Sequence, residues 1–76
     1  FDLQIKWSIY QKDKKELTEL FEELGAVESV EDKSKEDYIK IVDLYKRIDE
    51  KELIVRQDKK NFKDYINLIF LLLRKL

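Results

Sequence analysis

The last sixteen residues constrain the fold of this chain more than any other stretch. They read NFKDYINLIFLLLRKL (61–76), with an unbroken apolar run from Leu68 to Leu73. A helix that is apolar on nearly every side must be buried in protein or lie in a membrane. A bilayer span needs about 20 apolar residues, and Lys63, Asp64 and Asn67 interrupt the first half of this stretch. The sequence therefore predicts a closing helix over 59–76 that is covered by protein.

The apolar residues of this closing helix divide into a main face and a flank. The main face consists of Phe62, Tyr65, Ile66, Ile69, Leu72, Leu73 and Leu76. Their helical spacing predicts that this face is intramolecular core. Leu68, Phe70 and Leu71 widen the apolar surface beyond what a small sheet can cover. Because an exposed apolar patch of this kind marks an interface, these three residues are the candidate protein-interaction site.

The first half of the chain predicts a strand followed by a helix. Five apolar residues alternate with polar ones over positions 1–10, and these are Phe1, Leu3, Ile5, Trp7 and Ile9. Strict alternation is typical of a strand with one buried face. Asp13 and Glu16 then have the spacing of a capping box, which predicts a helix over 13–24. Gly25 is the only glycine and stands where a left-handed residue would end that helix.

The middle of the chain leaves two interpretations open. Residues 26–31 suggest a short strand, and Ser34 with Asp37 suggests the start of a helix over 35–49. The alternative is a hairpin in which 26–31 pairs with 38–44. The helix is favoured because Glu36–Lys40 and Asp43–Arg47 are correctly oriented charge pairs. Leu53, Ile54 and Val55 then suggest a third short strand.

These elements give the order strand, helix, strand, helix, strand, helix. The predicted class is α+β, with a small sheet packed against three helices. The 76 residues form one small domain or a fragment of a larger fold. A chain of this length buries only about 60% of the surface that its unfolded form exposes. So small a sheet cannot readily cover two long helices, so either the helices pack on each other or another chain completes the core.

The residue types present argue against catalysis. The chain has no cysteine and no histidine, which removes thiol chemistry, the usual zinc sites and histidine general bases. A single glycine leaves no room for glycine-rich phosphate-binding loops. Adjacent carboxylates point in different directions on a helix and are read as a solvated face. We therefore expect no catalytic residues, no metal, no cofactor and no enzyme activity, and the sequence indicates no cellular compartment.

Charge is balanced overall but unevenly distributed. The 16 basic and 17 acidic side chains nearly cancel, yet residues 1–50 have a net charge of −5 and residues 51–76 of +4. The basic residues Arg56, Lys59, Lys60 and Lys63 lie beside Phe62 and Tyr65. Aromatic rings can stack on bases while lysines contact phosphates, so these four residues are candidate nucleic-acid contacts. Core packing of the two aromatic residues is the favoured alternative.

Read in order, three segments resemble the later part of a LAGLIDADG homing-endonuclease domain. These segments are IKWSIYQKDKKELTELFEELGAVESV, EDYIKIVDLYKRI followed by LIVRQ, and NFKDYINLIFLL. They are similar to the family's strand, helix, next strand, following helix, connector and closing helix. The family's name-giving helix, which carries its catalytic acids, has no counterpart here. The resemblance implies a nucleic-acid-facing sheet that contains Gln4, Lys6 and Ser8, without cleavage activity.

Three functional hypotheses follow. The leading one is a non-catalytic structural or protein-interaction module that uses its apolar C-terminal helix to bind a protein partner or another copy of itself. The second is a nucleic-acid-binding remnant similar to the homing-endonuclease fold. The third is an engineered scaffold without natural function, suggested by the joint absence of cysteine, histidine, methionine and proline.

Overall fold

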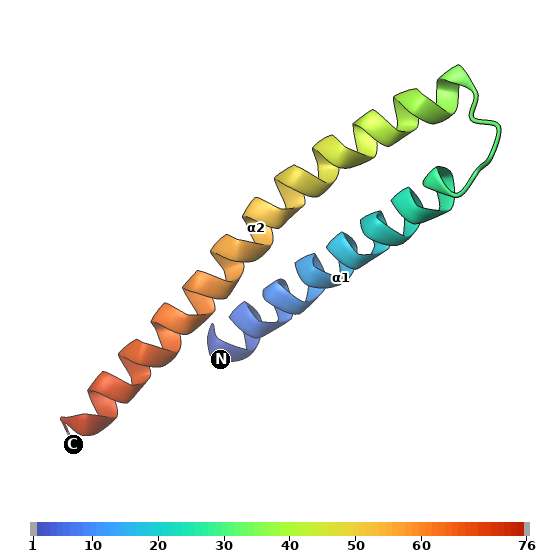
Figure 1. The fold of residues 1–76 in the computed structure, drawn as a ribbon. Coiled ribbons are helices and arrows are strands. Elements are labelled where there is room, and N and C mark those ends of the chain that lie inside the picture. Colours follow the sequence, from blue (N-terminus) through green and yellow to red (C-terminus); the bar gives the residue numbers. More distant parts are fainter. Residues whose placement is uncertain (1, 76) are drawn as a thin grey trace.

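The computed structural model describes residues 2–75, which form two long antiparallel helices joined by a short loop (Figure 1). Helix α1 spans Asp2–Glu28 and helix α2 spans Lys35–Arg74. Together they make a rod with extents of 64 × 15 × 15 Å. The predicted α+β class is therefore wrong, since residues 2–75 contain no strand and the protein is an all-α helical hairpin.

One row of residues on each helix faces the other helix, at alternating spacings of three and four. In α1 this row is Leu3, Lys6, Tyr10, Asp13, Leu17, Leu20, Leu24 and Val27; in α2 it is Ile41, Leu44, Ile48, Lys51, Val55, Asp58, Phe62, Tyr65 and Ile69. Every member is buried or half-buried. A mean spacing of 3.5 residues keeps such a row facing a partner helix, as in a coiled coil. We call the contact between the two rows the seam.

The fully buried core is confined to the loop end of the seam. Leu24, Val27, Leu44 and Ile48 form one cluster, and Leu17, Leu20 and Ile41 pack against it. Leu44 is the most deeply buried side chain, with 1% of its surface exposed. Farther from the loop, charged residues interrupt the seam. Apolar burial therefore holds the two helices together mainly near the loop.

The predicted strand over positions 1–10 is wrong, because its described residues lie in α1. The row that starts at Leu17 extends back through Tyr10 and Leu3, so a helix places both against α2. Ile5, Trp7 and Ile9, the residues expected on a buried strand face, are instead exposed by 46% to 57%. A strand needs a neighbour for its backbone hydrogen bonds, and residues 2–75 offer none. Phe1 lies outside the described residues.

The predicted helix over 13–24 exists, but both of its predicted ends are wrong. Asp13 lies in the middle of α1, in the seam, and the helix runs past Gly25 to Glu28. Gly25 does not have a positive φ angle. Continuing the helix buries Val27 in the core, which outweighs the weak helix preference of one glycine. The short strand predicted over 26–31 is also wrong.

Gly25→Ala is therefore expected to stabilise the hairpin by about 1 kcal/mol, because alanine loses less backbone freedom than glycine in a helix interior. A Cβ atom at this position meets no other atom within 4 Å. Urea unfolding followed by circular dichroism measures the change. A loss of stability on Gly25→Ala would show that the helix ends here after all.

The predicted helix start at Ser34 is confirmed. The Ser34 Oγ accepts a hydrogen bond from the Asp37 N–H at 3.2 Å, and the Asp37 carboxylate accepts one from the Ser34 N–H at 2.9 Å. The hydrogen bond that the Ser34 N–H donates to the Asp37 carboxylate is the largest cause that lowers the pKa of Asp37 below its usual value. The helix over 38–44 is confirmed against the alternative hairpin, and Arg47 pairs with Asp43 at 3.0 Å.

The third predicted strand, at Leu53–Val55, is wrong because α2 continues unbroken through it. No glycine or proline lies between Lys35 and Arg74 to interrupt the helix. The two helices predicted over 35–49 and 59–76 are parts of one helix of 40 residues. The seam row continues through Lys51, Val55 and Asp58, so the inward face is maintained even where it is charged.

Candidate functional site

Within residues 2–75, the last turns of α2 extend beyond the start of α1 (Figure 1). α2 has 40 residues and α1 has 27. Near the start of α1, the Trp7 ring lies 5.0 Å from the Phe62 ring, and the Lys6 Nζ lies 5.4 Å from the centre of the Tyr65 ring. These contacts place the first turns of α1 level with residues 62–65. We call the part of α2 that projects past them, residues 68–75, the overhang.

The overhang exposes five large apolar side chains. Leu68, Phe70, Leu71, Leu72 and Leu73 are each exposed by 52% to 61%. The structure thus places the candidate interface residues Leu68, Phe70 and Leu71 at the surface. The prediction that Leu72 and Leu73 are core is wrong. The sheet expected to cover them does not form, and the described part of α1 does not extend far enough to cover them. Leu76 lies outside the described residues.

The other described residues of the predicted main face lie in the seam or beside it. Phe62, Tyr65, Ile66 and Ile69 are half-buried. A shallow groove on the overhang is lined by Asn67, Phe70, Leu71 and Arg74. The apolar cover supplied by α1 thus decreases along α2 from Phe62 onward and is lost at the overhang, where apolar side chains surround the helix.

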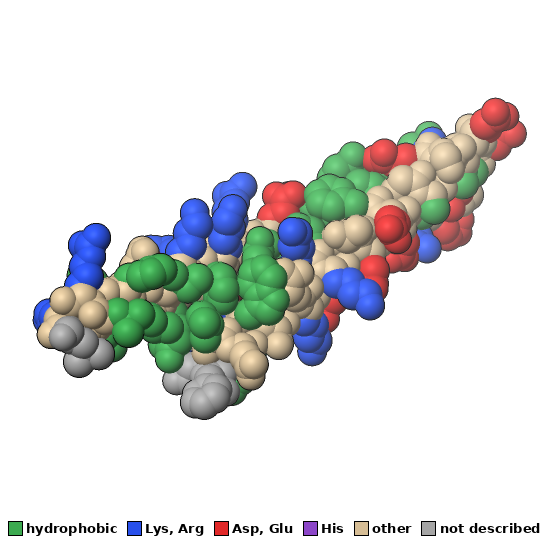
Figure 2. All heavy atoms as spheres, turned by 90° about the horizontal axis from the view of Figure 1, so that it is seen from below, with side chains coloured by type: hydrophobic (Ala, Val, Ile, Leu, Met, Phe, Trp, Pro, Cys, Tyr) green, Lys and Arg blue, Asp and Glu red, His purple; other side chains and the backbone are tan. Residues whose placement is uncertain are grey.

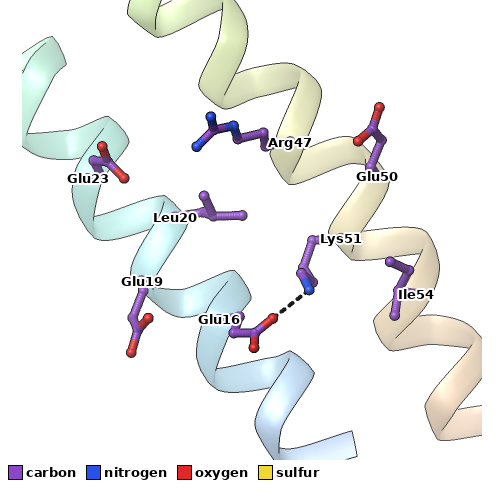
Figure 3. A pocket seen from close by; sticks show the side chains of 8 residues that line it. All are labelled: Glu16, Glu19, Leu20, Glu23, Arg47, Glu50, Lys51 and Ile54. Atoms are coloured by element: carbon purple, nitrogen blue, oxygen red, sulfur yellow. Dashed lines mark hydrogen bonds and ion pairs between the residues drawn. The ribbon is translucent and has the colours of Figure 1, made fainter.

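A cluster of charged residues occupies the seam between the core and the terminal end. The Lys51 ammonium lies 2.6 Å from a Glu16 carboxylate oxygen (Figure 3). It also lies 3.5 Å from a carboxylate oxygen of Asp13. Lys51 and Asp13 side chains are exposed by only 21% and 17%. The hydrogen bond to Glu16 raises the pKa of Lys51 above its usual value. Sequence reasoning missed this cluster because Asp13 was interpreted as a helix cap.

Asp58 is the least satisfied member of this cluster. Its Oδ2 atom is buried and has no hydrogen-bond partner. Burial, followed by the hydrogen bond to Asp13 and the charge of Asp13, raises the pKa of Asp58 to about 6. The same hydrogen bond from Asp58 lowers the pKa of Asp13. Two carboxyl groups this close cannot both ionise freely, so the pair makes the seam sensitive to pH.

A groove beside this cluster carries mixed charge. It is lined by Glu16, Glu19, Leu20, Glu23, Arg47, Glu50, Lys51 and Ile54 (Figure 3). Leu20 contributes an apolar floor, and Glu23 also pairs with Lys40 at 3.4 Å across the two helices. Within residues 2–75, no group of three or more acidic side chains is placed to hold a metal ion. The groove offers an ion-pair surface to a partner.

The candidate nucleic-acid contacts fall on separate surfaces. Arg56, Lys59, Lys60 and Lys63 line one groove on α2 together with Asp64 and Asn67. Lys6 instead lines a groove with Ile9, Asp58 and Asn61, and Gln4 and Ser8 are exposed on α1. The sheet that was expected to present Gln4, Lys6 and Ser8 together is replaced by a helix. Phe62 is packed against Trp7, so its ring is not free to stack on a base.

Neither helix contains a stretch long and apolar enough to cross a membrane, as the sequence predicted. The described residues form an elongated hairpin whose overhang exposes apolar side chains. No family model, curated protein or solved structure matches the chain.

Proposed function

We propose that this chain is a non-catalytic helical-hairpin module that binds another helical protein surface through its overhang. The observation that supports the proposal is the projection of five large apolar side chains past the end of α1, each more than half exposed. Isolated apolar residues on a surface need no explanation, but a contiguous set marks an interaction site.

The free energy available from covering the overhang is large enough for association. Burying one large apolar side chain contributes about 1.5–3 kcal/mol. Leu68, Leu71 and Leu72 recur at spacings of three and four, which is the row that an amphipathic helix presents to a groove or to another helix. Because each of these five side chains is already nearly half covered, burial of this row with Phe70 and Leu73 contributes roughly 6 kcal/mol, which lies within the range of the cost of association. A helical partner therefore fits this surface.

The double variant Leu68→Glu, Leu71→Glu is expected to weaken association at least tenfold, because each substitution places a charge in the contact. Sedimentation velocity over a range of concentrations measures association of the intact chain with itself. The matched control is Ile39→Glu, Leu53→Glu, which makes the same kind of change at two residues of α2 that are exposed by 60% and 64%.

The control and test variants introduce the same charge at similarly exposed residues of the same helix, so they differ only in the position of the substitutions. If the unaltered chain associates and both double variants associate equally well, with circular dichroism showing intact helices in all three, the overhang is removed as the binding site. A loss of association in the control as well would show that α2 associates through its whole surface.

A further inference from the structure

We infer that the surface covering the overhang belongs to a second copy of this chain, packed side by side and antiparallel to the first. This inference rests on the proposed function and specifies its partner. It is carried by a second apolar surface near the loop and by the opposite charges of the two halves of the rod.

One long side of the rod is apolar near both ends. We define the lateral face as the residues that recur at intervals of seven beside the seam: Trp7, Lys14, Phe21 and Glu28 in α1, and Tyr38, Tyr45, Glu52, Lys59, Ile66 and Leu73 in α2. Residues seven apart lie on one side of a helix after two turns. The Tyr45 hydroxyl donates a hydrogen bond to the Glu28 carboxylate at 2.7 Å, which places the two rows on the same side of the hairpin.

The apolar residues of the lateral face form two patches. In the loop half, Phe21, Tyr38 and Tyr45 are exposed by 46% to 59%, and neighbouring Val42 by 70%. In the terminal half, Trp7 and Leu73 are exposed by 46% and 57%. The charged residues Lys14, Glu52 and Lys59 lie between the patches. Sequence analysis did not find this face because it assigned Trp7 to a strand.

The two halves of the rod have opposite charge. Residues 19–50, around the loop, hold 5 basic and 11 acidic side chains, a net charge of −6. The other residues, 1–18 and 51–76, hold 11 basic and 6 acidic side chains, a net charge of +5. Figure 2 shows Lys and Arg mainly over the terminal half, Asp and Glu mainly over the loop half, and hydrophobic side chains over both.

This charge distribution selects the antiparallel arrangement. Two parallel copies would bring −6 beside −6 and +5 beside +5, whereas antiparallel copies bring each acidic half beside a basic half. Like charges across an interface are unfavourable, and complementary ones fix the orientation of the partners. The antiparallel arrangement also places each overhang beside the loop half of the other copy, so that the apolar patch of one end covers that of the other.

The rod is large enough for a stable twofold dimer. A face 64 Å long and 15 Å wide offers a contact area of about 1,000 Å² per copy, against about 800 Å² per partner in a standard interface. A twofold axis across the middle of α2 makes the same face of both copies the contact, as is usual in homodimers. The product is a four-helix bundle whose two hairpins point in opposite directions.

Distances between spin labels on two copies test the orientation directly. The chain has no cysteine, so Asp32→Cys labels only the loop and Leu53→Cys labels only the middle of α2. Double electron–electron resonance on each singly labelled chain should give a Leu53→Cys distance on the order of 30 Å, set by the width of two packed helix pairs. The Asp32→Cys distance should approach the 64 Å length of the rod.

The other outcomes separate this inference from the proposed function. Short distances at both labels indicate parallel copies, and long distances at both indicate contact only between overhangs. Either result overturns the antiparallel inference but leaves the proposed function intact, provided that Leu68→Glu, Leu71→Glu still weakens association. Association that is antiparallel by distance yet unaffected by that double variant removes Leu68 and Leu71 from the contact instead. A chain that stays monomeric at every concentration overturns this inference.

Discussion

Leu44→Ala is expected to destabilise the hairpin by about 3 kcal/mol, the largest effect of any conservative substitution that we predict. Leu44 is 1% exposed and lies in the cluster with Leu24, Val27 and Ile48. Removing three carbons from a fully buried leucine costs 2–5 kcal/mol, because apolar contacts are lost and the cavity left behind fills only partly. The measurement is urea unfolding of the intact chain, followed by circular dichroism.

The size of this effect follows from how little core the hairpin has. Only four side chains are buried among the residues described, and small domains have thin stability margins. Alanine also favours helix slightly more than leucine does, so any loss must come from packing.

Leu53→Ala is the matched control, since it makes the same change in the same helix at a residue exposed by 64%. We expect it to change stability by less than about 0.5 kcal/mol. An equal loss of stability in both variants would mean that Leu44 is no more buried than Leu53, and the hairpin would need another arrangement.

The second large effect is a gain of stability on mild acidification. The pKa of Asp58 is raised from 3.8 to about 6 in the folded chain, so between these values the folded state binds more protons than the unfolded state. The free energy of unfolding therefore rises as the pH falls from about 7 to about 4. A shift of this size corresponds to at most about 3 kcal/mol. Thermal melts at fixed ionic strength across this pH range provide the measurement.

Asp13 and Asp37 should reverse the trend at lower pH. Both pKa values are lowered from 3.8, so each carboxylate contributes stability that is lost as the pH falls through its own folded pKa, below 3.8. Stability should therefore be highest between about pH 4 and pH 5, which is below the range usual for proteins.

Asp58→Asn tests the assignment of this pH dependence. The variant should be more stable than the unaltered chain at pH 7, because the amide removes the carboxylate charge at position 58 and its repulsion with Asp13. Its stability should vary little between pH 4 and pH 7. Asp64→Asn is the matched control, since Asp64 is an exposed residue two turns further along α2. A pH profile that survives Asp58→Asn unchanged would assign the titration to another group.

The helical parts of the fold were predictable where local signals and apolar periodicity agreed. Ser34 and Asp37 satisfy each other's backbone groups, and such a cap needs only neighbouring residues. The helix in 13–24 was also predictable, since Leu17, Leu20 and Leu24 share one face. The prediction failed where polar residues occupy the inward row, as Lys6, Asp13, Lys51 and Asp58 do. A search for apolar spacing alone does not find a seam that contains charges.

The sequence by itself determined which chemistry is missing, where α2 begins and where apolar residues outnumber the cover available to them. Only the tertiary structure decided that positions 2–10 are helical. Over these nine residues the sequence fits two patterns at once. Apolar and polar residues alternate as in a strand, and Leu3 and Tyr10 lie seven apart, as residues on one side of a helix do. Whether these residues form a helix or a strand depends on which element packs against them. The long α2 offers a row of side chains for packing, and no strand among residues 2–75 offers backbone groups. Within residues 2–75, the closing stretch is therefore the exposed end of the longer helix of a hairpin.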